Sequence, residues 1–483
     1  MNALAAAAWL MTPACAAPLA ARSAAASADS SVGVDAAVFD AESSTGAAAA
    51  LALYAAAGVK WARVSAGPAE AGAPSADPAA EPMLEQAFVG GQKTLLALRG
   101  ADAGEPTAWV DWAGAQAASA RGSASAFEID ADSPTWGADA AAFAALARRG
   151  AAKALAADPG AEIALGFSGR ERGEFARAAA VAAADAARIA VLRGDDGAVA
   201  ALRAALGRDM VRPDQAWVVL PAPPQDESRA VRAKRMLVGV VSALGGGAAR
   251  VFFARDRGAE AADPSDGQDP FWNAARSLAD LFGDGVSATS SARLQAQGAV
   301  PGFSQAAFMT RRGEPVLAFW SGAAPSDDGV ETPVVLSLTA PINDPVLVDP
   351  LSADARPLGS GTQTVVSARA ADYPRFVTAA SVLRAQAASL IVAEQVKSIP
   401  EVSLGDGPVE LRFTTTAPAD AAVEVFTERR ELLRRFPVRA VAGRNSVEWD
   451  AQHYGDGVYY WRVSAGGEEV VRRVVVARAR ATP

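Results

Sequence analysis

The sequence contains very little cysteine and histidine: one residue of each, Cys15 and His453, among 483. A single cysteine cannot form a disulfide within the chain, and the two residues together cannot supply the ligands of an ordinary zinc site. His453 lies near the C-terminus, which excludes Ser-His-Asp and Cys-His catalysis in a domain formed by the preceding residues. We therefore expect no metal site, and we expect His453 to be an exposed loop residue.

The chain also lacks long basic runs, long apolar runs and a glycine-rich phosphate loop. Lys and Arg total 45 against 54 Asp and Glu, a formal net charge of −9, which argues against nucleic acid or an anionic membrane as the main partner. The longest apolar run after residue 30, residues 236–253, is interrupted by three glycines, so we expect no transmembrane helix. No glycine-rich loop follows the first predicted strand, and we expect no cofactor.

Residues 1–30 are typical of an export signal, because an apolar core at 3–11 precedes small residues suited to cleavage. The segment before that core has no Lys or Arg, so a disordered Ala-rich leader is the alternative. A lipoprotein anchored through Cys15 is a further, poorer alternative, because the residues before Cys15 make a poor lipobox. The prediction is an exported bacterial protein located in the periplasm, at the cell surface or outside the cell.

Residues 31–285 alternate between strand-like and helix-like segments. The eight strand-like segments are residues 31–36, 60–66, 93–99, 124–130, 162–168, 187–193, 216–220 and 249–255. Strands that alternate with helices predict a parallel sheet, and eight such units in about 250 residues predict a closed (β/α)8 barrel.

After residue 286 the helical periodicity gives way to short β-rich runs separated by turns. Residues 287–383 predict an antiparallel β-sandwich, residues 384–400 a linker, and residues 401–478 an immunoglobulin-like β module. The predicted fold class is therefore multidomain, α/β followed by all-β.

The rest of the chain is organised around residues 125–136, a strand that ends in carboxylates and is followed by Pro134. In a (β/α)8 barrel the carboxyl ends of the strands carry the active site. Polar candidates for this mouth are Asp35, Arg63, Arg99, Asp102, Asp130, Asp132, Trp136, Arg193, Asp195, Arg255 and Asp256. They predict either a polar cleft that binds a sugar, with Trp136 stacked on a ring, or an ordinary solvated surface with ion pairs among Arg63, Arg99, Asp130 and Asp132.

The stretch resembles the fourth strand of retaining (β/α)8 glycoside hydrolases, which carries an aromatic-Glu-Ile-x-Asn-Glu-Pro motif. Residues 127–129, Phe-Glu-Ile, keep its beginning, and Pro134 and Trp136 suit its end. Ala131 stands where that family has Asn, and Asp132 stands where it has the acid/base Glu. The resemblance implies Asp132 as the catalytic candidate. Residues 53–64, 156–166 and 250–253 with 271–276 resemble further barrel segments of the same family, and residues 316–321 resemble its appended β-sandwich.

The family's nucleophile lies on the seventh strand, in a Trp-x-Thr-Glu pattern, where this chain has residues 217–220, Trp-Val-Val-Leu. Leu220 cannot attack an anomeric carbon, so the resemblance implies an inactive glycosidase-like protein. It would bind a glycan or serve a cell-surface protein assembly, and the substrate-binding residues would be Asp35, Arg63, Asp130, Trp136, Asp195 and Asp256. The alternative is an active glycosidase with relocated carboxylates: Asp132 as acid/base and Asp256 or Asp195 as its partner.

The C-terminal residues resemble another known module. Residues 442–450, Ala-Gly-Arg-Asn-Ser-Val-Glu-Trp-Asp, and residues 455–461, Gly-Asp-Gly-Val-Tyr-Tyr-Trp, are similar to the immunoglobulin-like module of flagellar hook-capping proteins and of bacterial secreted proteins. The resemblance implies a module that binds or spaces and does not catalyse.

Overall fold

The structure is a computed structural model of the chain. It describes residues 30–36, 44–68, 76–99, 106–130, 139–168, 178–194 (without 181, 184, 185 and 188), 216–255, 269–387, 391–392, 401–404, 408–466 and 468–477. Residues 1–29 of the predicted leader lie outside this part. None of the helices in the described ranges is long and apolar enough to cross a membrane.

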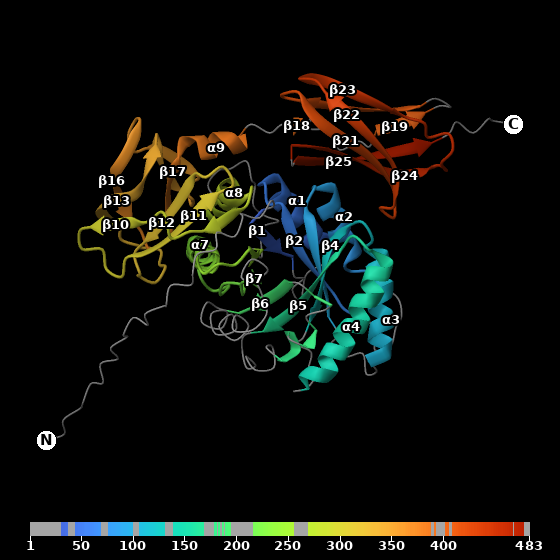
Figure 1. The fold of residues 1–483 in the computed structure, drawn as a ribbon, viewed down its shortest axis with the longest axis horizontal. Helices are drawn as coiled ribbons and strands as arrows, with labels where there is room; N and C mark the ends of the chain where they lie inside the picture. Colours follow the sequence, from blue (N-terminus) through green and yellow to red (C-terminus); the bar gives the residue numbers. More distant parts are fainter. Residues whose placement is uncertain are drawn as a thin grey trace.

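Eight parallel strands form a closed barrel in which β1 pairs with both β2 and β8 (Figure 1). The strands are β1 (Val32–Asp35), β2 (Trp61–Ala66), β3 (Lys93–Leu98), β4 (Ala124–Asp130), β5 (Glu162–Ser168), β6 (Ile189–Arg193), β7 (Ala216–Val219) and β8 (Arg250–Ala254). The helices around them are α1 (Ser44–Ala56), α2 (Glu81–Val89), α3 (Pro106–Ser119), α4 (Ala140–Ala157), α7 (Arg229–Gly245) and α8 (Pro270–Phe282). The expected (β/α)8 barrel is confirmed.

The bottom of the barrel is filled by aromatic side chains. Trp61, Trp217 and Phe252 pack together inside it, and the Arg250 guanidinium lies 3.8 Å and 4.3 Å from the two indole rings. A β-carbon at Gly33 would lie 2.8 Å from the Phe252 ring, so only glycine fits there. Because this end is packed solid, a site inside the barrel can open only at the carboxyl ends of the strands.

A β-sandwich follows the barrel and shares its core. Its sheets have the orders β15-β14-β17-β12-β11-β9 and β10-β13-β16. Its elements are β9 (Val286–Ala288), β10 (Leu294–Gln297), β11 (Ser304–Thr310), β12 (Pro315–Trp320), β13 (Thr332–Asn343), β14 (Pro345–Asp349), β15 (Asp354–Pro357), β16 (Thr362–Ala370), β17 (Arg375–Ala379) and α9 (Ala380–Ala387). Phe282 of α8 packs on Phe308 and Phe376 of the sandwich, with ring centroids 5.1 and 5.8 Å apart.

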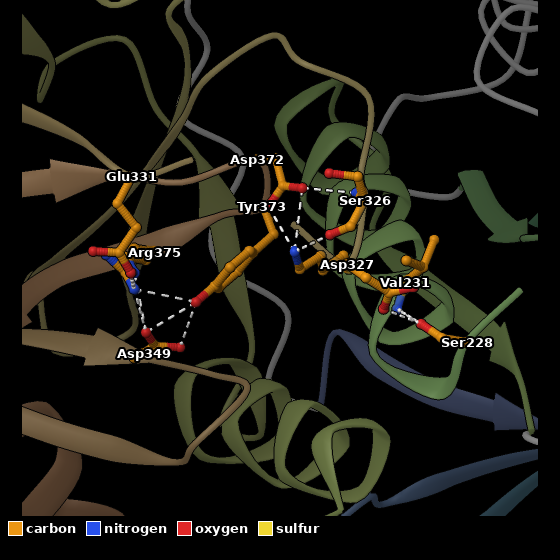
Figure 2. Close-up of polar contacts among 10 residues, drawn as sticks. Ser228, Val231, Ser326, Asp327, Glu331, Asp349, Asp372, Tyr373 and Arg375 are labelled. Carbon is orange, nitrogen blue, oxygen red and sulfur yellow. Dashed lines mark hydrogen bonds and ion pairs between the residues drawn. The ribbon is translucent and has the colours of Figure 1, made fainter. Parts of the chain in front are cut away.

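A buried ion pair also joins α7 to the sandwich (Figure 2). The Lys234 ammonium lies 3.0 Å from Asp372 Oδ1 and donates to the Ser326 carbonyl at 2.6 Å. The Ser326 amide in turn donates to Asp372 at 2.8 Å. Both charged side chains are almost fully buried, so the pair fixes the β12–β13 loop against α7.

The C-terminal module consists of two sheets with the orders β18-β20-β23 and β19-β25-β24-β21-β22. Its strands are β18 (Ile391–Val392), β19 (Glu401–Leu404), β20 (Val409–Thr415), β21 (Ala419–Thr427), β22 (Leu432–Ala440), β23 (Gly443–Trp449), β24 (Gly457–Ala465) and β25 (Glu468–Ala477). Antiparallel sheets after the barrel are thus confirmed. The exact boundaries at 287–383, 384–400 and 401–478 stay a prediction, and α9 continues past residue 383. His453 is exposed in a turn.

This module packs against α2 of the barrel. Phe88 is buried between Phe426 and Tyr460, with both pairs of ring centroids 5.6 Å apart and edge-to-face. Arg430 donates to Glu81 at 2.6 Å, and the Tyr460 hydroxyl donates to Glu85 at 2.5 Å. The outer face of the five-stranded sheet is therefore an interdomain surface.

Candidate functional site

Charged side chains gather inside the upper part of the barrel, above the aromatic layer. Phe127 and Ile129 of β4 belong to the core beneath the helices. Because successive strand residues face opposite sides, Glu128 and Asp130 both face the interior. Glu128 was not among the residues predicted for this site. Its spacing of two from Asp130 was the signal that could have identified it.

Arg63 of β2 binds the Glu128 carboxylate with two hydrogen bonds. Its Nε donates to Oε2 at 2.7 Å and its Nη2 donates to Oε1 at 3.1 Å, while Nη1 donates to Asp35 Oδ1 at 3.2 Å. Glu128 is fully buried and Arg63 is 2% exposed. Burial opposes the guanidinium charge, but the carboxylates of Glu128 and Asp35 outweigh that effect and raise the pKa of Arg63 above its ordinary value.

The space for the Glu128 carboxylate comes from Gly166 on the neighbouring strand β5. A β-carbon at position 166 would lie 2.3 Å from Glu128 Oε1. Any side chain at this position would therefore clash with the carboxylate and displace it. Glycine at this position therefore lets Glu128 reach Arg63.

A second arginine, Arg193 at the end of β6, binds the other β4 carboxylate. Its Nη1 donates to Asp130 Oδ2 at 2.8 Å, and its Nη2 also binds Oδ1 of the same carboxylate. Its Nε lies 3.9 Å from Glu128 Oε1. The Arg193 side chain is 18% exposed, so this pair lies nearer to solvent than the Arg63–Glu128 pair.

The site therefore holds three carboxylates, of Asp35, Glu128 and Asp130, against the guanidinium groups of Arg63 and Arg193. A carboxylate that accepts two hydrogen bonds from one guanidinium is held in a fixed orientation. Such an arrangement stabilises fixed charges, and it presents donors and acceptors in set positions at the mouth. Within the described ranges, no group of three or more His, Cys, Asp or Glu side chains is arranged to hold a metal ion.

The structure brings together three of the predicted substrate-binding residues, Asp35, Arg63 and Asp130. The predicted catalytic residue Asp132 and the predicted binding residues Trp136, Asp195 and Asp256 lie outside the described residues. Their roles stay predictions. Of the ion pairs expected among Arg63, Arg99, Asp130 and Asp132, the described ones instead join Arg63 to Glu128 and Asp35, and Asp130 to Arg193.

Leu220 does not occupy the position that the sequence resemblance assigned to it. Trp217 and Val219 of β7 face the barrel interior. Leu220 belongs to the core beneath the helices, and its Cδ1 would lie 2.9 Å from a β-carbon at Gly239 of α7. Trp217 and Val219 therefore occupy the inward positions of β7, and Leu220 lies on the opposite side of the chain. The inward residue near the end of β7 is thus Val219, which is also not a carboxylate.

Comparisons with known proteins find likeness in structure only. No family model and no curated protein matches the sequence. An α-L-arabinofuranosidase from Thermotoga maritima is similar at 12% identity, covering 68% of this chain and 89% of that one with a TM-score of 0.43. A GH51 arabinofuranosidase from Xanthomonas axonopodis pv. citri has 11% identity, coverages of 69% and 88% and a TM-score of 0.42. The maltogenic α-amylase AmyB from Thermotoga neapolitana has 10% identity, coverages of 72% and 97% and a TM-score of 0.41.

The (β/α)8 fold that the sequence resemblance implied is present in this chain, followed by antiparallel sheets. The closed ladder of eight parallel strands and the antiparallel sheets that follow it carry this assignment.

Proposed function

We propose that the protein binds carbohydrate at the mouth of a glycosidase-like barrel and does not hydrolyse glycosides by the retaining mechanism. One observation carries this proposal: Arg63 and Arg193 bind the three carboxylates that the structure describes inside the barrel. A protein assembly at the cell surface, with the barrel as a platform, is the second role that we propose for the same surface.

Retaining hydrolysis needs two carboxyl groups about 5–5.5 Å apart, one able to exchange a proton and one able to attack the sugar. Glu128 is fully buried and is held by two hydrogen bonds from Arg63. Trp217 and Val219, the inward residues of β7, cannot attack. Among the described residues, β7 therefore supplies no nucleophile for this mechanism.

The same ion pairs suit binding. Sugar hydroxyl groups both donate and accept hydrogen bonds. Arg193 offers donors and Asp130 offers acceptors, and the ion pair between them holds both side chains in place. Fixed groups lose little conformational entropy when a ligand binds. Arg63 holds Glu128 and Asp35 from below. Trp136, Asp195 and Asp256 remain the further residues that we propose for sugar binding.

The test combines turnover and binding. We expect the purified protein to show no hydrolysis of aryl glycosides, and to bind a saccharide in a glycan-array screen followed by calorimetry. Arg193→Gln should weaken that binding by about tenfold or more, since a charged hydrogen bond contributes about 1.5–3 kcal/mol. Arg312→Gln, a change of the same type in the exposed β11–β12 turn, should have no effect.

Two outcomes would overturn the proposal. Turnover that disappears in Asp132→Asn, with the circular dichroism spectrum unchanged, would show an active glycosidase with Asp132 as acid/base and Asp195 or Asp256 as its partner. Equal saccharide binding by wild type, Arg193→Gln and Arg193→Lys would exclude the mouth as the binding site.

We further propose that residues 1–30 direct export, on the basis of their apolar core and small residues. Expressed in a bacterium, the full-length protein should be recovered from the periplasm, the cell surface or the medium as a form about 15–30 residues shorter. Recovery of the unprocessed chain from the cytoplasm, with a marker secretory protein exported normally, would contradict this.

A further inference from the structure

A second concave site lies at the junction of the barrel and the sandwich, at the far end of α7 from the mouth. It has a volume of about 530 Å³ and is lined by Ser242 and Gly245 from the last turn of α7 and by residues of the sandwich. Because α7 begins beside the mouth end of β7 and runs back toward the start of β8, this cavity opens on the opposite side from Arg193 and Asp130. Junctions between domains are frequent places for ligand sites.

Hydrogen bonds fix the backbone at Arg293, an exposed residue, and the side chain of Gln305 beside this cavity. The Arg293 amide donates to Thr339 Oγ1 at 2.8 Å, and the Thr339 amide donates to the Arg293 carbonyl at 3.0 Å. Gln305 Oε1 accepts from the Leu294 amide at 2.8 Å, which orients the side-chain amide and leaves its NH₂ group as a donor. Among the described residues, no carboxylate lies within ion-pair distance of the Arg293 guanidinium, and none lines the cavity.

The remaining lining residues suit a sugar ring. Trp320, at the end of β12, supplies an aromatic surface, and Ser242, Thr289 and Ser304 supply hydroxyl groups. The small residues Ala306 and Gly245 approach each other so closely that a β-carbon at 245 would lie 3.0 Å from that of Ala306. Larger side chains at these positions would fill the hollow.

We propose that this cavity binds a sugar that bears a carboxylate, of the uronic acid class. The carboxylate of the sugar would accept hydrogen bonds from Arg293. The Gln305 amide and the hydroxyl groups that line the cavity would form hydrogen bonds with the oxygen atoms of the sugar ring. The C-terminal end of α7 carries a partial negative charge, which disfavours an anion here. A charged hydrogen bond from a guanidinium is the stronger effect, so the arginine outweighs the helix. The cavity is separate from the mouth of the barrel. If it does not bind a uronic acid, the proposed function of the mouth is unaffected.

Calorimetric titration of the full-length protein with trigalacturonic acid and with neutral maltotriose tests this assignment. We expect the charged trisaccharide to bind and Arg293→Gln to weaken it by about tenfold or more. Gln305→Ala should weaken it less. Arg312→Gln, which removes an exposed arginine elsewhere on the sandwich, should leave this affinity unchanged.

The assignment is overturned if the charged trisaccharide does not bind at millimolar concentration, or if Arg293→Gln binds it as tightly as wild type. It is also overturned if maltotriose and trigalacturonic acid bind with equal affinity, since the carboxylate would then contribute nothing. Loss of binding in Arg193→Gln alone would place the ligand at the mouth instead.

Discussion

Replacing Arg63 with methionine is expected to lower the free energy of unfolding by about 3–5 kcal/mol. The variant leaves the carboxylate of Glu128 fully buried without the cation that binds it at 2.7 and 3.1 Å. Arg193 compensates only in part, because its Nε lies 3.9 Å from Glu128 Oε1 while both of its Nη atoms bind Asp130. Urea unfolding followed by circular dichroism measures the change, and the barrel transition should move to lower urea.

Two further variants separate this electrostatic cause from a simple loss of packing. The double variant Arg63→Met/Glu128→Leu removes both charges and should recover most of the lost stability, since a buried pair replaced by apolar residues is often neutral. Lys153→Met, which breaks an ion pair whose partners are 54% and 55% exposed, should change stability by less than about 1 kcal/mol. The explanation is wrong if the double variant is no more stable than Arg63→Met.

Replacing Phe88 with aspartate is expected to release the C-terminal module from the barrel while both remain folded. Removing a buried phenylalanine costs about 3–5 kcal/mol, and here that loss falls on the contact with Phe426 and Tyr460. Small-angle X-ray scattering should show a larger radius of gyration. Proteolysis should become faster in the linker predicted at residues 384–400.

The matched control for this prediction is Leu432→Asp, which changes an exposed leucine on the same module, 54% exposed. Its scattering curve and its cleavage rate should equal those of wild type. An unchanged radius of gyration in Phe88→Asp would mean that the hydrogen bonds of Arg430 to Glu81 and of Tyr460 to Glu85 suffice to hold the module.

The barrel could be predicted from the sequence because the patterns that indicate its strands and helices lie within short stretches of the chain. Phe127 and Ile129 alternate with polar residues over one strand, and helical stretches separate each strand from the next. The position of the candidate site at the end of β4 follows from the same pattern, because the strand direction alone decides which end carries the polar residues.

The partners inside the site could not be predicted, because they lie on strands that are far apart in sequence. Arg63 and Glu128 are 65 residues apart, and Asp130 and Arg193 are 63 apart. Leu220 was also expected to face the site, but it packs beneath the helices. A sequence motif does not determine which residues of a strand face inward. Phe88 reads as an ordinary apolar residue of an amphipathic helix, and nothing near it in the sequence indicates a partner beyond residue 400.

The docking of the C-terminal module on α2 also means that α2 is translated well before its partner. Glu85 and Tyr460 are 375 residues apart, so at about 5–20 residues per second a ribosome needs roughly 20–75 s to supply the partner after α2 has emerged. Throughout that interval Phe88 is an exposed aromatic residue on a nascent chain. Glu81 and Glu85 lie on the same helix, and charged neighbours of this kind discourage aggregation. We expect the two carboxylates to limit aggregation of α2 during that interval, before they accept hydrogen bonds from Arg430 and Tyr460.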